Sequence, residues 1–90
     1  MRIPSYTHLF KKDLKLMGRR RMDMDAIHSI IDLILLGEPL PAHCKEHGLS
    51  GNLEGLMDCH VKGGLVLIYE IKDDENLVVF HRLGTHSDLF

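Results

Sequence analysis

The fold is decided by the stretch LMDCHVKGGLVLIY at residues 56–69. Side chains in its first half alternate between the two faces of a predicted strand. Asp58 and His60 therefore fall on one solvated face, and the residues beside them fall on the core face. The glycine pair at 63–64 is a hairpin turn signal. The run at 65–69 is continuously apolar, as expected of a central strand covered on both faces. The stretch therefore predicts an antiparallel hairpin in the middle of a sheet.

The chain continues beyond this hairpin as a three-stranded meander. Residues 72–76, KDDEN, are a polar turn, and a third strand is predicted from Leu77 to Arg82. Gly84 is expected to break that strand before a short tail. Residues 43–54, ahead of the hairpin, are expected to form a loop.

The N-terminal third of the chain predicts a first helix with two different faces. Thr7 is its expected N-cap and Gly18 its expected stop. Phe10, Leu14 and Met17 follow a helical spacing and share an apolar face. A second face repeats basic residues at the same period: Lys12, Lys15 and Arg19.

A second helix is indicated by apolar residues at helical spacing, namely Ile27, Ile30, Ile31, Ile34 and Leu35. Asp23 or Asp25 caps its start, and Gly37 followed by Pro39 ends it. A short link joins the two helices as a helical hairpin. Before them, residues 2–6 are expected to form a short strand that its proline confines to an edge or a loop.

Helices and strands are segregated along the chain, which predicts an α+β fold: an N-terminal helical hairpin and an antiparallel sheet in one domain, residues 1–90. No stretch reaches the ~18 apolar residues that a membrane span needs. The first residues lack the hydrophobic region of a signal peptide, so a cytoplasmic location is expected. In that compartment Cys44 and Cys59 are expected to be free thiols.

The net charge of −2 conceals an uneven distribution. Residues 1–21 hold seven basic residues against one acidic residue, a net charge of +6, whereas residues 22–90 carry −8. Such a division is typical of a protein that presents a basic surface to nucleic acid. It is equally typical of a solvated helix face followed by a polar turn, and charge alone leaves both interpretations open.

Histidines are the residues with the clearest chemical potential, because an imidazole gives or takes a proton near neutral pH. Five of the seven lie between His43 and His86. Asp58 precedes His60 by two residues and is expected beside it on the same face of the strand, where a carboxylate would orient the imidazole. The alternative is a surface pair without a function.

Together, His60, one of His47 or His86, and Arg82 would form a set for metal-free RNA cleavage without a cofactor. A base removes the proton from a ribose 2′-OH, an acid protonates the departing 5′-oxygen, and a cation stabilises the charge on phosphorus. Arg82 has a structural alternative, which is a salt bridge at the sheet edge with Asp88 as its partner.

Zinc binding is a competing use of some of these residues. The candidate ligands are Cys44, His47, Cys59 and His60. Adjacent strand residues such as Cys59 and His60 point to opposite faces, however, and the spacing lacks the paired C-x-x-C regularity of strong zinc motifs. The residues therefore favour acid–base chemistry over a metal site.

Several motifs resemble the YafQ branch of the RelE/ParE toxin superfamily over essentially the whole chain. They are His47-x-Leu49-x-Gly51, Gly55-x-x-Asp58-Cys59-His60-Val61, Leu67-Ile68-Tyr69 and Arg82-x-Gly84-Thr85-His86-Ser87-x-Leu89-Phe90. The resemblance implies a RelE-like microbial ribonuclease fold and a bacterial type II toxin that cleaves mRNA in the ribosomal A site. It also implies a cognate antitoxin of the RelB/DinJ kind, with operator DNA bound only through the complex and no membrane partner.

Matched position by position, the resemblance implies acid–base positions for His47, His60 and His86, with Asp58 as a supporting carboxylate and Arg82 stabilising the phosphate. Residues expected to contact RNA or the ribosome are Lys11, Lys12, Lys15, Arg19, Arg20, Arg21 and the terminal aromatic Phe90. Such contacts give a salt-dependent affinity.

The chain departs from the family pattern just before its central strand. Family members usually carry an acidic residue where this chain has Gly64, an aromatic residue at Leu65 and an arginine at Met57. Loss of the carboxylate would weaken catalysis. Two alternatives to an active nuclease follow: an impaired module that binds the antitoxin and acts as a corepressor, and, less favoured, the small zinc protein.

Overall fold

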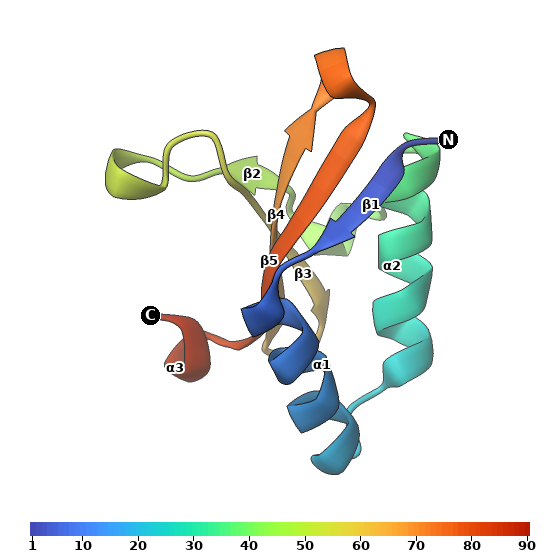
Figure 1. Cartoon of the computed structure of the whole chain (residues 1–90). Coiled ribbons are helices and arrows are strands. Elements are labelled where there is room, and N and C mark those ends of the chain that lie inside the picture. Colours follow the sequence, from blue (N-terminus) through green and yellow to red (C-terminus); the bar gives the residue numbers. More distant parts are fainter.

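The computed structural model describes residues 1–90 and is built on a five-stranded sheet with the strand order β1-β5-β4-β3-β2 (Figure 1). The strands are β1 (Ile3–Tyr6), β2 (His47–Gly48), β3 (Met57–Lys62), β4 (Leu65–Lys72) and β5 (Leu77–Thr85). The predicted hairpin is confirmed, because β3 and β4 pair antiparallel on either side of the glycine turn. The whole apolar run at 65–69 is buried in central strand β4.

The sheet is larger than the predicted meander and is not wholly antiparallel. Edge strand β1 pairs with β5 in parallel, since both helices and three strands separate the two along the chain and no hairpin fixes their direction. At the opposite edge, β2 pairs with the start of β3, so the segment at 43–54 is not simply a loop. It also holds two short 3₁₀ turns, η1 (Ala42–Cys44) and η2 (Gly51–Leu53).

Helix α1 (His8–Arg19) begins as predicted and ends slightly later. The Thr7 hydroxyl caps the helix by accepting the Phe10 N–H at 3.0 Å. The helix continues past Gly18, and the reversal occurs at Arg21, which has a left-handed backbone with φ of 57°. A non-glycine residue therefore performs the turn that the pattern assigned to glycine.

Helix α2 (Met24–Leu36) confirms the predicted boundaries and core stripe. Asp23 is the N-cap and accepts the Ala26 N–H at 3.0 Å. Gly37 ends the helix with φ of 73°, a conformation that favours glycine. All five stripe residues are buried.

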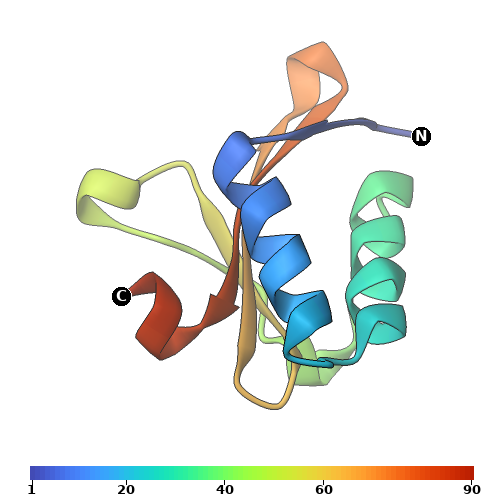
Figure 2. The ribbon, with the colours of Figure 1, turned by 60° about the horizontal axis from the view of Figure 1, so that its bottom comes forward.

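Both long helices cover one face of the sheet. Buried side chains of α1 and α2 pack against those of β3, β4 and β5, and the tilted rings of Phe10 and Phe80 lie 5.7 Å apart between centroids. Two views place η2 and the C-terminal helix on the opposite side of the sheet from α2, whereas η1 stays on the helix side (Figure 2). None of the helices combines the length and the hydropathy needed to cross a lipid bilayer.

The N-terminus of α1 also covers the outer edge of β5 where β1 ends. The Thr7 N–H donates to the Phe80 carbonyl at 3.2 Å, and the Thr7 hydroxyl donates to the His81 carbonyl at 2.9 Å. One turn and a half further along, Asp13 accepts the Leu83 N–H at 3.0 Å. These bonds satisfy backbone groups that an exposed sheet edge would leave unpaired.

The end of β5 corrects the expectation for Gly84. The strand passes through Gly84 to Thr85, and the chain then forms the short helix α3 (His86–Leu89) rather than an irregular tail. A Cβ at Gly84 would lie 2.9 Å from the Cβ of Asp88. The glycine therefore permits α3 to fold back closely on the strand. Glycine within a strand often marks such a close approach of another segment.

Candidate functional site

The candidate site lies on the sheet face opposite α1 and α2, where facing residues form two rows across the strands. Direct pairing brings His47, Asp58, Ile68 and Arg82 into one row across β2, β3, β4 and β5. With strands ~4.8 Å apart, His47 and Arg82 stand roughly 14 Å from each other. The next row runs from His60 through Val66 to Gly84.

The second row brings two imidazoles together. Because Gly84 has no side chain, α3 packs over the end of this row and places His86 near His60, with 5.8 Å between their ring centroids. Phe90, just after α3, lies 5.6 Å from the His86 ring. Residues that are remote in sequence, on β3 and at the C-terminus, thus form a compact His–His–Phe group.

His47 stands apart from this pair but is oriented for proton transfer. Its Nδ1 lies 2.8 Å from the Lys45 carbonyl, which can only accept a hydrogen bond. In the neutral ring the proton is therefore on Nδ1 and the lone pair on Nε2, and the side chain is 54% exposed. The geometry suits a proton acceptor that faces solvent.

The expectation that Asp58 lies on a solvated face is wrong, although Asp58 shares a face of β3 with His60 as expected. Asp58 is only 3% exposed, and its neighbour across the β2–β3 pairing is His47. Its Oδ1 lies 3.9 Å from Nδ1 of His47 and has no hydrogen-bond partner. The carboxylate therefore faces His47 rather than His60.

Arg82 forms its salt bridge with Asp13, and not with Asp88, which was the partner expected if Arg82 had only a structural role. Nε donates to Oδ2 at 2.8 Å and Nη2 to Oδ1 at 3.2 Å, and the Asp13 hydrogen bond raises the pKa of Arg82. A guanidinium has five N–H donors, so three remain for another acceptor. Arg82 is thus fixed in position while it keeps donors for a phosphate.

Two hollows meet at Arg82. One, of about 310 Å³, lies over the sheet between the 51–56 segment and the C-terminus, and its lining includes Leu53, Leu56, Ile68, His81, Leu89 and Phe90. The other, of about 460 Å³, lies beside α1 and is lined by Lys12, Lys15 and Arg19. Arg82 and Leu9 line both hollows. The basic face of α1 therefore adjoins the candidate site.

The other predicted RNA-contacting residues are distributed differently. Lys11 lines a separate small hollow with Tyr6 and His28. Arg21 is exposed at the turn after α1. Arg20 forms an ion pair with Asp88, with Nη1 2.8 Å from Oδ2. The basic cluster of the sequence is therefore not one continuous surface.

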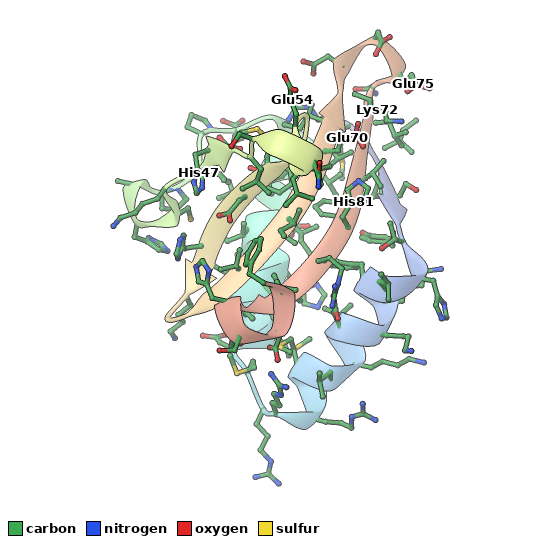
Figure 3. The ribbon with its side chains drawn as sticks, turned by 90° about the vertical axis from the view of Figure 1, so that its left-hand side faces the viewer. His47, Glu54, Glu70, Lys72, Glu75 and His81 are labelled. Atoms are coloured by element: carbon green, nitrogen blue, oxygen red, sulfur yellow. The ribbon has the colours of Figure 1, made fainter.

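Two histidines without an expected role make structural contacts. His43 Nε2 lies 3.2 Å from the Val61 carbonyl, along the part of the β3 edge that β2 leaves open. His81 Nε2 lies 3.2 Å from Oε1 of Glu70, and Figure 3 shows this pair across the sheet from His47. Leu53 and Leu56 of the apolar hollow were not anticipated as site residues, since a leucine before a strand carries no functional signal in a single sequence.

The four candidate zinc ligands do not converge. Cys44 and Cys59 are buried in the core on the helix side, whereas His60 belongs to the opposite face. No three of the His, Cys, Asp and Glu side chains lie close enough together to hold a metal ion. Burial raises the pKa of Cys59 to about 12, so this thiol stays protonated near neutral pH and is a poor nucleophile.

Comparison with known proteins assigns the chain to a class. Residues 2–90 match the family model described as bacterial toxin of type II toxin-antitoxin system, YafQ. The mRNA interferase toxin YafQ of Escherichia coli strain K12 is 38% identical over 86 residues, which cover 94% of this chain and 91% of the relative. The sheet with its helical hairpin and C-terminal histidine thus belongs to a bacterial type II toxin.

Solved structures agree with this assignment. The crystal structure of YafQ from E. coli strain BL21(DE3) superposes with a TM-score of 0.92 at 36% identity, covering 100% of this chain and 99% of the other. YafQ in the E. coli DinJ-YafQ toxin-antitoxin complex gives a TM-score of 0.88 at 38% identity, with 99% and 97% covered. The chain belongs to the YafQ toxin family.

Proposed function

We propose that this chain is an mRNA interferase that cleaves mRNA on the ribosome, without a metal, through attack of a ribose 2′-OH on the adjacent phosphate. The observation that carries the proposal is the His60–His86 pair, 5.8 Å apart between ring centroids, on the same face as Arg82, which keeps unused donors and lines a hollow with Phe90. The relative named mRNA interferase supports the same activity.

In this scheme one imidazole of the His60–His86 pair removes the 2′ proton and the other protonates the leaving 5′-oxygen. Paired imidazoles suit these tasks because each exists in both protonation states near pH 7. His47, with its lone pair on Nε2, is a further proton acceptor at the other end of the face. Asp58 supports His47 through the buried carboxylate that faces it.

The remaining site residues bind RNA. The free N–H donors of Arg82 stabilise the charge that develops on phosphorus. Phe90, more than half exposed beside His86, offers a face on which a base stacks. Lys12, Lys15 and Arg19 extend the positive surface from Arg82 along α1, where ribosomal or messenger RNA phosphates bind in a salt-dependent manner.

The proposed partner is a cognate antitoxin similar to DinJ, since a YafQ relative is known in a toxin-antitoxin complex with that protein. An acidic antitoxin segment would neutralise the basic face of α1 and so compete with RNA. Operator DNA would be contacted through the antitoxin complex only. Translating ribosomes place the site of action in the cytoplasm.

Gly64 supports a second candidate, an antitoxin-binding corepressor module with little nuclease activity. Gly64 lies in the exposed β3–β4 turn, and a Cβ there would meet no atom within 4 Å. The turn therefore accommodates the acidic residue that the family pattern expects, yet this chain lacks it. Tight antitoxin binding without mRNA cleavage, both by this chain and by its Gly64→Asp variant, would favour this candidate.

The roles of the two central histidines are tested by His60→Ala and His86→Ala. Each should lower the rate of mRNA cleavage by about 10²- to 10⁴-fold, the usual contribution of a general acid or base. Cleavage is measured by primer extension in a translation extract, and circular dichroism checks the fold. His28→Ala, exposed on α2, is the matched control and should cleave normally. Full activity of both site variants would refute their roles.

A further inference from the structure

The position of His86 depends on a short terminal helix. Helix α3 has only four residues, and none of them is buried. Short segments with few buried contacts open easily. A histidine that must meet His60 therefore needs a specific interaction to hold its helix in place.

Asp88 supplies the first part of that interaction. Its Oδ2 accepts the Thr85 N–H at 2.9 Å and the Thr85 hydroxyl at 3.0 Å, while the Thr85 hydroxyl accepts the Asp88 N–H at 3.3 Å. This reciprocal capping box fixes the turn from β5 into α3. It sets the direction in which α3, which begins with His86, leaves the strand.

Arg20 supplies the second part from a different element. At the C-terminal cap of α1, it donates from Nη1 to Oδ2 of Asp88 at 2.8 Å and from Nη2 to Oδ1 at 3.2 Å. Such bidentate pairs fix orientation as well as distance. The bonds from Arg20 and Thr85 hold the pKa of Asp88 well below its usual range, so the pair is fully charged near neutral pH.

We propose that Arg20 and Asp88 are positioning residues that hold α3 so that His86 meets His60 and Phe90 flanks the scissile phosphate. This inference rests on the proposed nuclease function. Arg20 then does not belong to the RNA-binding residues, and its role differs from those of Arg19 and Arg21. Arg19 lines the basic hollow and Arg21 is exposed beyond α1, whereas Arg20 connects α1 to the helix that carries the histidine.

The pair acts on the local position of α3 rather than on the stability of the whole protein. Both partners are solvent-accessible, and exposed ion pairs contribute little to global stability. Small displacements of a reacting group nevertheless reduce catalysis strongly. Loss of the pair should therefore change the turnover number while the urea midpoint of unfolding stays the same.

A double-mutant cycle tests this coupling through cleavage of ribosome-bound mRNA. Arg20→Gln and Asp88→Asn should each lower kcat about tenfold with KM unchanged, and the double variant should be no slower than Asp88→Asn alone. Arg19→Gln, the matched variant on the RNA-facing side, should instead raise KM. An Arg20→Gln effect confined to KM, or one that multiplies with Asp88→Asn, would overturn the proposal.

A second measurement does not depend on cleavage and so separates failure of the proposal from failure of the nuclease function. Backbone ¹⁵N relaxation and the nuclear Overhauser effects between the His60 and His86 rings report the order of α3 directly. In Arg20→Gln, residues 86–90 should become mobile and the His60–His86 effects should disappear, while Arg19→Gln keeps both. A rigid α3 in Arg20→Gln, with the His60–His86 effects intact, would overturn the proposal.

Discussion

Asp13 joins α1 to β5 through one carboxylate. It lies on the buried side of α1, accepts the Leu83 N–H at the open edge of β5, and binds Arg82 through two hydrogen bonds. The apolar spacing of Phe10, Leu14 and Met17 correctly predicts the buried face of α1, but it gives no reason to place an acid there. That reason is a sheet edge some 70 residues later.

Replacing Asp13 with alanine should therefore destabilise the protein. The change leaves Arg82 and the Leu83 N–H without their partner and should lower the free energy of unfolding by about 2 kcal/mol. Urea denaturation followed by circular dichroism measures the effect. Asp32→Ala, at an exposed position of α2, is the matched control and should change stability by less than about 0.5 kcal/mol. Equal midpoints for the two variants would contradict the role of Asp13.

Single residues of the site were predictable to different degrees. The imidazoles His47, His60 and His86 were anticipated, and the structure brings two of them together. Asp58 was assigned to the wrong histidine, because the register of β2 against β3 decides its neighbour and no local pattern encodes a two-residue strand. The partner of Arg82 was missed for a similar reason, since it comes from a helix far away in sequence.

At the scale of elements, α3 is the one that completes the site. Its four residues carry no amphipathic period long enough to predict a helix, although Thr85 and Asp88 form its capping box. Gly84 was expected to end β5, yet glycine in a strand also marks a close approach of another segment. Only the folded structure shows that Gly84 permits such a close approach.

Gly84→Ala tests whether this close approach matters for activity. The new Cβ would lie 2.9 Å from Asp88 Cβ and 3.3 Å from a Leu89 methyl, so α3 must move away from β5. Cleavage of ribosome-bound mRNA should fall at least about tenfold as His86 leaves His60. Gly18→Ala, which adds a Cβ in open space within α1, should cleave normally and gain up to about 1 kcal/mol of stability. Normal cleavage by Gly84→Ala would contradict the account of α3.

At the scale of the whole molecule, the hydrophobic pattern predicted most of the architecture. The two helices, their N-caps, the central strand and the hairpin follow from local spacing and turn residues. The parallel pairing of β1 with β5 and the covering of the free edge by α1 depend on long-range topology, which local patterns do not contain. The site depends on both local patterns and long-range topology, since the sequence indicates its histidines but not the distances between them.

Gly64 bears on the molecule as an enzyme rather than on its fold. The turn that holds it is exposed and has room for a side chain, so an aspartate there should leave the architecture unchanged. The histidine pair and Arg82 are in place without it. We therefore expect this chain to be a nuclease of reduced rate, and an acidic residue at position 64 to raise that rate.

The most direct test is a reconstituted translation reaction with the purified chain and its Gly64→Asp variant, in which mRNA is mapped at nucleotide resolution with and without ribosomes. We expect cuts at codon boundaries on ribosome-bound mRNA, made faster by the Gly64→Asp variant, and intact mRNA when ribosomes are omitted. Intact ribosome-bound mRNA with both proteins, at concentrations that saturate the ribosomes, would contradict the central claim.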